Sequence, residues 1–160
     1  MNSDKIVKTV LLNAPLDRVW RAITDSKEFG TWFGMRLEGP FTAGQSIKGV
    51  IACTAVDEEV ARMQKPYEGT PVHFFVEKIQ PQTLFAIKWH PYAIDPEVDY
   101  SKEPMTLITF ELEQKDAGIL LTITESGFDK IPLHRRAEAF NANEGGWQKQ
   151  TELIQKYLEQ

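Results

Sequence analysis

The sequence predicts an α+β domain in which a run of antiparallel strands is flanked by helices. The first observation is that residues 5–12 are rich in Val, Leu, Ile and Thr, which is typical of a strand. The second is that several short stretches between residues 45 and 125 alternate apolar with polar side chains. The third is that residues 133–159 carry apolar side chains at three- and four-residue steps, as a long helix does. Consecutive strands without intervening helices favour this class over a βαβ fold.

Two short helices are expected after the first strand. Pro15 suits the first turn of a helix, because that turn leaves its backbone N–H groups unpaired in any case. The apolar residues that follow recur at helical spacing until Asp25, and Ser26 is predicted to cap a second short helix that runs to Gly30. A dense apolar cluster comes next, formed by Trp32, Phe33 and Met35.

The middle of the chain is predicted to supply most of the sheet. Residues 45–54 alternate and form one strand, which places Cys53 on its apolar face as a small, inert core residue. Residues 71–79 and 83–90 form one hairpin, and residues 105–113 and 119–125 form a second. Two loops remain: residues 55–69, with at most one helical turn, and the Pro- and Asp-rich residues 91–104.

The last helix is predicted to present one stripe of side chains to the interior. Steps of three and four residues along it define the stripe. Its members are Leu133, Ala137, Phe140, Glu144, Trp147, Thr151, Ile154 and Leu158.

Length and composition exclude several classes of function. The 160 residues suit a single domain over residues 1–160, and 42% hydrophobic with 26% charged residues is an ordinary globular balance. A formal net charge of −5 provides no basic surface for nucleic acid or an anionic membrane. The single cysteine, and the absence of an apolar run long enough for a signal peptide or a membrane span, predict a cytoplasmic protein.

The two ends of the chain together resemble one known family. The N-terminal part of the match is Asn13-Ala14-Pro15, Val19-Trp20, Ala22-Ile23-Thr24-Asp25 and Trp32-Phe33. The C-terminal part is residues 121–128 (LTITESGF), followed by Gly146-Trp147 and Tyr157-Leu158-Glu159. These segments resemble the family named for activators of the ninety-kilodalton heat-shock protein's ATPase, a branch of the SRPBCC or START-like superfamily, which includes the birch-pollen allergen.

The resemblance implies a helix-grip fold with an internal cavity. In that fold a curved antiparallel sheet, here of about six to seven strands, wraps around the long C-terminal helix, and two short helices follow strand one. The space between sheet and helix is hydrophobic. The chain departs from the family at Glu125, where many relatives have histidine, and at Thr151, where many have leucine. The ligand preferences of relatives are therefore not carried over.

Two glutamates interrupt faces that are otherwise apolar. Glu125 continues the inward register of Leu121 and Ile123, and Glu144 lies between Phe140 and Trp147 on the helical stripe, just before two glycines. An unpaired buried carboxylate is costly, so both side chains are candidates to address a ligand's donor or positive group. The alternative is that Glu125 is solvated at a strand end and that Glu144 faces solvent.

Aromatic side chains are the other candidate ligand contacts. They offer a large apolar area and can stack on flat molecules, although a filled core would use them equally well. The predicted ligand-binding residues are Trp32, Phe33, Trp89, Glu125, Phe128, Phe140, Glu144 and Trp147.

No metal site, cofactor or catalytic residue is predicted. His73, His90 and His134 lie on different elements, and no HxxxH or CxxC spacing occurs. His90 and Tyr92 are placed to border the cavity mouth, but no acid/base partner of His90 is visible in the sequence. No GxSxG elbow or phosphate-binding loop is present.

Three functions remain open. The leading one is binding of a small hydrophobic or aromatic molecule between sheet and helix. The alternatives are a protein that stimulates a chaperone ATPase and a cyclase- or hydratase-type enzyme using Glu125, Glu144 or His90. A chaperone partner is not expected, because the chain starts directly at the first strand, without the separate N-terminal domain of the eukaryotic activators. A homodimer is compatible with the pattern.

Overall fold

The computed structural model describes residues 5–160 and contains one seven-stranded antiparallel sheet in the order β1-β7-β6-β5-β4-β3-β2. The strands are β1 (Lys5–Leu12), β2 (Met35–Leu37), β3 (Ser46–Ile51), β4 (Pro71–Gln80), β5 (Leu84–Trp89), β6 (Thr106–Lys115) and β7 (Gly118–Ser126). The helices are α1 (Leu16–Thr24), α2 (Ser26–Phe33), α3 (Glu58–Gln64) and α4 (Leu133–Leu158). Short 3-10 turns η1 (Lys65–Tyr67), η2 (Tyr100–Lys102) and η3 (Phe128–Lys130) complete the chain.

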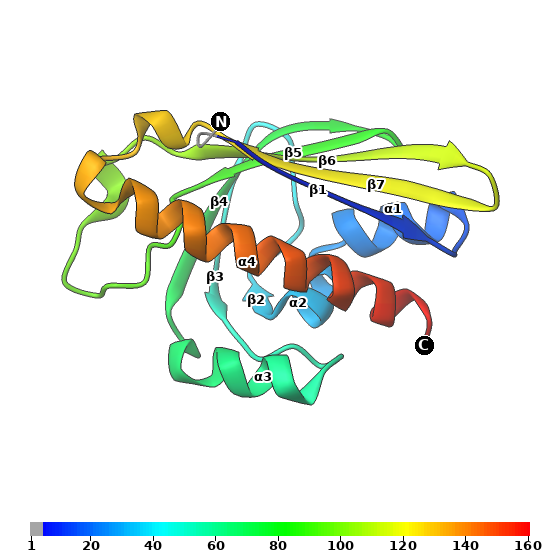
Figure 1. Cartoon of the computed structure of the whole chain (residues 1–160), viewed down its shortest axis with the longest axis horizontal. Helices are drawn as coiled ribbons and strands as arrows, with labels where there is room; N and C mark the ends of the chain where they lie inside the picture. Colours follow the sequence, from blue (N-terminus) through cyan, green and yellow to red (C-terminus); the bar gives the residue numbers. More distant parts are fainter. Residues whose placement is uncertain (1–4) are drawn as a thin grey trace.

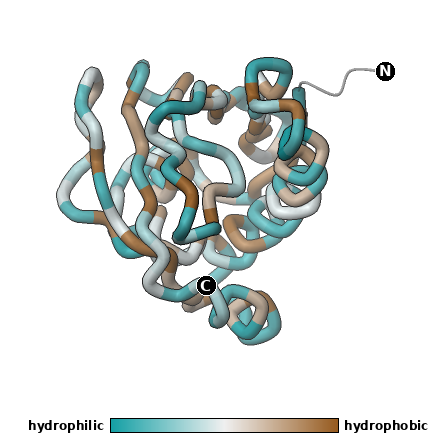
Figure 2. The backbone as a smooth tube through the Cα atoms, turned by 90° about the vertical axis from the view of Figure 1, so that its left-hand side faces the viewer, coloured by the Kyte–Doolittle hydropathy of each residue, from teal (hydrophilic) through white to brown (hydrophobic). Residues whose placement is uncertain are grey.

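The sheet curves around α4, which crosses its concave side (Figure 1). This arrangement confirms the predicted α+β class, the helix grip, the strand number and the two short helices after the first strand. Along β7 every second residue is buried, from Ile119 to Glu125, so one face of this strand belongs entirely to the interior. The alternation of hydrophobic and hydrophilic residues is visible along the chain in Figure 2. Strand periodicity therefore decides which face of the sheet meets α4.

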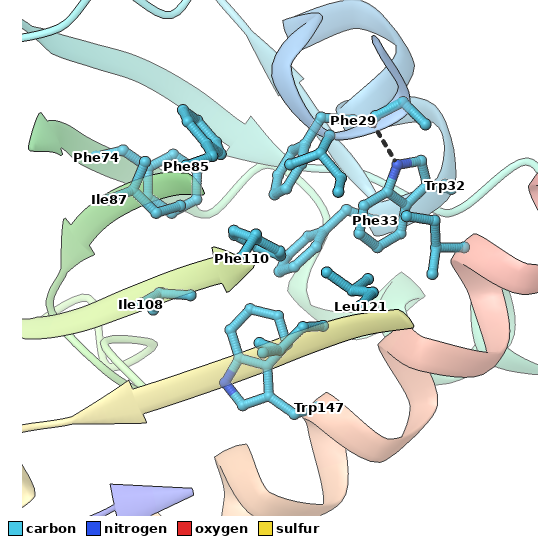
Figure 3. Close-up of a cluster of buried hydrophobic side chains, with 14 of the residues drawn as sticks. Phe29, Trp32, Phe33, Phe74, Phe85, Ile87, Ile108, Phe110, Leu121 and Trp147 are labelled. Carbon is cyan, nitrogen blue, oxygen red and sulfur yellow. Dashed lines mark hydrogen bonds between the residues drawn. The ribbon is translucent and has the colours of Figure 1, made fainter. Parts of the chain in front are cut away.

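An aromatic core fills one end of the space beneath α4 (Figure 3). Phe29 stacks on Phe33 with ring centroids 4.7 Å apart and meets Trp32 edge-on at 5.2 Å. The Trp32 indole is fully buried and donates its Nε1–H to the Ala22 carbonyl at 2.8 Å. Because this donor is satisfied within the chain, the ring is buried without an unpaired polar group.

Helix α2 is capped differently from the prediction. Asp25, not Ser26, is the N-cap, and its carboxylate accepts from the backbone N–H groups of Lys27 and Glu28 at 2.9 and 3.0 Å. Helix α2 ends at Gly34, whose φ of 99° is a left-handed conformation that glycine adopts without strain. The turn carries the chain into β2, a three-residue strand that the sequence did not reveal.

Three further expectations were wrong in detail. The segment predicted as a loop, residues 55–69, contains the two-turn helix α3 followed by η1. Cys53 lies beyond the end of β3 and is half-buried, with its Sγ 3.9 Å from Glu68 Oε2, because β3 stops at Ile51. On α4 the side chains of Leu133, Ala137 and Glu144 are exposed, so the inward stripe begins later than expected.

No helix within residues 5–160 is both long enough and apolar enough to cross a membrane.

Candidate functional site: a cavity between the sheet, α3 and α4

A cavity of about 790 Å³ opens at the other end of the concave face. Strands β2, β3 and β4 form one side of it, α3 and η1 form a second, the end of β5 and the loop after it form a third, and α4 closes the fourth. Most of the lining is apolar. The side chains that matter below are Phe33, Val60, Met63, Gln64, Tyr67, Trp89, His90, Tyr92, Asn143, Trp147 and Gln150, with Gly146 between them on α4.

Three aromatic rings form the innermost wall of the cavity. Phe33 meets Trp147 edge-on at 5.8 Å and Trp89 at 6.3 Å, and the two indoles are 6.0 Å apart. Phe74 stacks behind Trp89 at 5.6 Å. These centroid distances lie in the range in which aromatic pairs attract one another, so each ring holds its neighbours in place.

A buried carboxylate fixes the two indoles from behind. Glu125 is completely buried on β7 and does not line the cavity. Its Oε1 accepts from Trp147 Nε1 at 2.7 Å, and its Oε2 accepts from Trp89 Nε1 at 2.6 Å. Thr106 Oγ1 donates to Oε2 at 2.5 Å, and Asn143 Nδ2 lies 3.0 Å from Oε1. Four donors from β5, β6 and α4 thus meet on one side chain, which offsets the cost of burying it.

The wall formed by α3 is only lightly attached to the rest of the fold. None of the residues of α3 is buried. At its N-terminal end Asp57 caps the helix through Val60 N–H at 3.0 Å and pairs with Lys156 Nζ of α4 at 2.7 Å. Lys156 and the Val60 N–H lower the pKa of Asp57 to about 2.

At the other end of α3 one glutamine makes two bonds. Gln64 accepts from Thr54 N–H at 2.7 Å through its Oε1 and donates through Nε2 to the Phe33 carbonyl at 3.0 Å. Gln150 of α4 donates to the same carbonyl at 3.1 Å. The C-terminal end of α3 and the Gln150 side chain of α4 therefore meet at the Phe33 carbonyl.

The loop after β5 is held much more firmly. Arg135 of α4 donates twice to Glu103 Oε1, at 2.6 and 2.8 Å, and once to the Pro91 carbonyl at 2.8 Å. Its guanidinium also lies 4.8 Å from the centre of the Tyr100 ring. One largely buried arginine thus fixes both ends of the loop.

His90 stands where this loop begins, and it lines the cavity together with Tyr92. Its Nδ1 is buried and has no hydrogen-bond partner among the described residues. Burial lowers the pKa of the imidazole, against an opposing attraction from Glu103. A neutral imidazole is the form that this position favours.

The eight predicted site residues fall into three groups. Phe33, Trp89 and Trp147 line the cavity, and Glu125 stands directly behind the two indoles. Trp32 belongs to the filled core, and Phe128 and Phe140 pack on each other at 5.2 Å outside the cavity. Glu144 points outward, with 53% of its side chain exposed and its Oε2 3.3 Å from Lys8 Nζ.

Sequence reasoning missed the α4 residues that reach the cavity. Asn143, Gly146 and Gln150 line it, together with Trp147. Asn143 lies four residues before Trp147 and Gln150 lies three residues after it, which places all three on one face of a helix. A predicted stripe centred on Trp147 would therefore have included both. The predicted stripe placed Glu144 at the step that Asn143 takes.

A long helix held in a curved antiparallel sheet over an apolar cavity defines the helix-grip, START-like class of domain. The chain belongs to the family described as "Activator of Hsp90 ATPase homolog 1-like protein", which matches residues 13–159. The match confirms the family that the two ends of the sequence resemble. No curated protein matches the chain.

Solved structures share the fold at low sequence identity. DynU16, from the dynemicin biosynthetic locus, is 22% identical with a TM-score of 0.68; the match covers 98% of this chain and 47% of that one. This chain therefore spans about half of DynU16. Protein MLL2253 from Mesorhizobium loti is 19% identical over 97% of this chain and 96% of its own, with a TM-score of 0.70. The Aha1 dimer from Colwellia psychrerythraea is 16% identical, with a TM-score of 0.67; the match covers 97% of this chain and 96% of that one.

Proposed function

We propose that the protein binds a small, flat, apolar molecule in the cavity between the sheet, α3 and α4. The observation that carries this proposal is the pair of indoles, Trp89 and Trp147, which line an open cavity while one buried carboxylate fixes both of them. A volume of about 790 Å³ falls within the range of small-molecule sites.

The cost of this arrangement supports a binding role. Filling a core does not require a buried glutamate with four donors, since a set of apolar residues of similar volume in place of the glutamate and its partners packs equally well. It does fix the orientation of rings that border empty space. Rings that are oriented before a ligand arrives lose less freedom on binding, and so more of the contact energy appears as affinity.

The positions of the glutamates favour binding over acid/base catalysis. Both oxygens of Glu125 are occupied by donors, and Glu144 lies outside the cavity in an ion pair with Lys8. Of the described residues that line the cavity, Glu38 is the single acidic one, and it is exposed. Activation of a chaperone ATPase rests on the family description alone.

A fluorescence titration tests the proposal. N-phenyl-1-naphthylamine, a neutral, flat probe that becomes bright in apolar surroundings, is added to wild-type protein, to Trp89→Ala and to Trp20→Ala. Trp20 is the matched control because it is a half-buried tryptophan that does not line the cavity.

We expect saturable binding to the wild type and to Trp20→Ala. In Trp89→Ala the dissociation constant should rise about tenfold, because one stacking face is lost. Circular dichroism confirms that each variant is folded. Absence of saturable binding to the wild type, or equal binding by the two variants, would refute the proposal.

A further inference from the structure

Two neighbouring glycines, Gly145 and Gly146, lie in the interior of the 26-residue helix α4. Glycine is the poorest helix former after proline, so a pair in this position lowers the stability of the helix. Neither residue has the positive φ that would require glycine. Apart from its sequence neighbours and the adjacent backbone of α4, a Cβ atom added to either one would meet no atom of the described residues within 4 Å.

Other glycines of the chain show what a packing requirement looks like. A Cβ atom on Gly30 would lie 2.2 Å from the Met35 carbonyl oxygen, and one on Gly49 would lie 2.2 Å from that of Arg36. These two glycines let backbones approach each other closely. Packing within the chain therefore explains Gly30 and Gly49 but not the pair in α4.

The two α4 glycines differ in their surroundings. Gly146 lines the cavity, whereas Gly145 does not. Gly146 lies next to Trp147 and one turn from both Asn143 and Gln150, all of which line the same cavity. Its missing side chain leaves the helix backbone bare at the centre of this wall.

The position of α3 shows what lies across from Gly146. Asp57 contacts Lys156, and Gln64 meets Gln150 at the Phe33 carbonyl, so α3 and α4 run antiparallel along this stretch. Gly146 lies one turn before Gln150 on α4, and Tyr67 lies one turn after Gln64 in η1. Because the two segments are antiparallel, both positions lie on the same side of the point where Gln64 and Gln150 meet. Tyr67 and Met63 both line the cavity, yet 42% and 56% of these residues remain exposed. Apolar side chains thus face bare helix backbone across open space.

We propose that Gly146 is the ligand-contact position of α4, where a flat apolar molecule packs directly on the helix backbone in the slot between α4 and the Met63–Tyr67 wall. The missing side chain sets the thickness of the molecule that the slot accepts. This inference rests on the proposed function and assigns the ligand a specific place within the cavity.

The neighbouring glycine provides a matched control. Gly146→Leu and Gly145→Leu gain the same helix propensity one residue apart, but only the first places a side chain in the slot. We expect both variants to melt at a higher temperature than the wild type. Gly146→Leu should gain more, because its side chain covers exposed apolar surface of Met63.

Binding of N-phenyl-1-naphthylamine should separate the two variants in the opposite direction. Its dissociation constant should rise at least tenfold in Gly146→Leu and stay within twofold of wild type in Gly145→Leu. Gly146→Ala should fall between the wild type and Gly146→Leu.

Three different results would count against the account, and they are distinguishable. If the wild type binds the probe and Gly146→Leu binds it equally well, the assignment of Gly146 is wrong while the proposed function stands. If the wild type does not bind the probe, the proposed function fails, and the assignment of Gly146 fails with it. Equal melting temperatures of the two leucine variants would show that Gly146 does not face an apolar slot.

Discussion

The two ends of the concave face differ in how their aromatic side chains are used. At the filled end, Trp32 is buried among Phe29 and Phe33, and its indole N–H is bound to a backbone carbonyl of the neighbouring helix. At the open end, Trp89 and Trp147 border a cavity, and both indole N–H groups donate to the carboxylate of Glu125. Tryptophan therefore fills the core at one end and forms an oriented cavity wall at the other.

The segments that cover the open end also differ from each other. Arg135 ties the loop after β5 to α4 through a largely buried ion pair and a backbone carbonyl. Helix α3 buries no side chain and depends on Gln64 and on the exposed Asp57–Lys156 pair. Segments with few buried contacts open at low free-energy cost, so we expect α3 to be the more mobile wall.

The largest predicted effect is a difference in stability between a variant of Trp32, at the filled end, and a variant of Trp89, at the open end. Trp32→Ala should lower the free energy of unfolding by about 3–5 kcal/mol, because it leaves a large cavity in a filled core. Trp89→Ala should cost clearly less, because its ring already borders empty space. Urea denaturation measures both values, and equal losses would remove the distinction between the two ends.

Glu125 and Glu144 provide the next comparison. Glu125→Gln should destabilise the protein by about 3 kcal/mol, because an amide nitrogen then faces a buried donor and cannot accept its hydrogen bond. Glu144→Gln breaks only an exposed pair with Lys8 and should change stability by less than about 1 kcal/mol. Denaturation curves and the near-ultraviolet circular dichroism of the indoles report the two changes. Similar values for both variants would contradict the assigned role of Glu125.

Arg135→Met tests the firmly held loop. Its pair with Glu103 is neither exposed nor fully buried, so the loss of stability should be about 2 kcal/mol. Hydrogen exchange should quicken in residues 91–104 and stay unchanged in α3. Faster exchange in α3 instead would show that the two walls are coupled.

The smallest effect concerns the exposed anchor of α3. The pKa of Asp57 is lowered to about 2, so its contribution to stability is complete above its ordinary pKa near 4 and is lost as the pH falls toward 2. In Asp57→Asn the side-chain oxygen still caps α3, but the charge is gone. The melting temperature should therefore fall less steeply between pH 4 and pH 2 in the variant than in the wild type. Parallel curves would mean that the Lys156 pair contributes nothing.

The sequence predicted those parts of the fold whose side chains are buried periodically. Strand β7 alternates strictly, and α1 repeats its apolar residues at helical steps, so both were recognisable. Helix α3 was not recognised as a helix of this length, because it buries none of its residues and its apolar side consists only of Val60 and Met63. Helix α4 was recognised, but its inward face was misplaced where Asn143 and not Glu144 turns inward.

The local sequence could not predict which aromatic residues fill the core and which line the cavity. Trp32 lies between Thr31 and Phe33, and Trp89 lies between Lys88 and His90, but neither pair of neighbours shows what covers the ring. The distant partners, the Ala22 carbonyl and the Glu125 carboxylate, separate core from cavity wall. The cavity itself depends on α3, whose position is set by contacts with Phe33 and Lys156 far away in the chain.

The most direct test of ligand binding in this cavity is a proton–nitrogen NMR titration with N-phenyl-1-naphthylamine. The four tryptophans give four indole N–H signals. We predict that the signals of Trp89 and Trp147 and the amide of Gly146 shift together and saturate, while those of Trp20 and Trp32 stay in place. Shifts confined to Trp20 or Trp32, or no saturable shift of the two cavity indoles, would contradict the account.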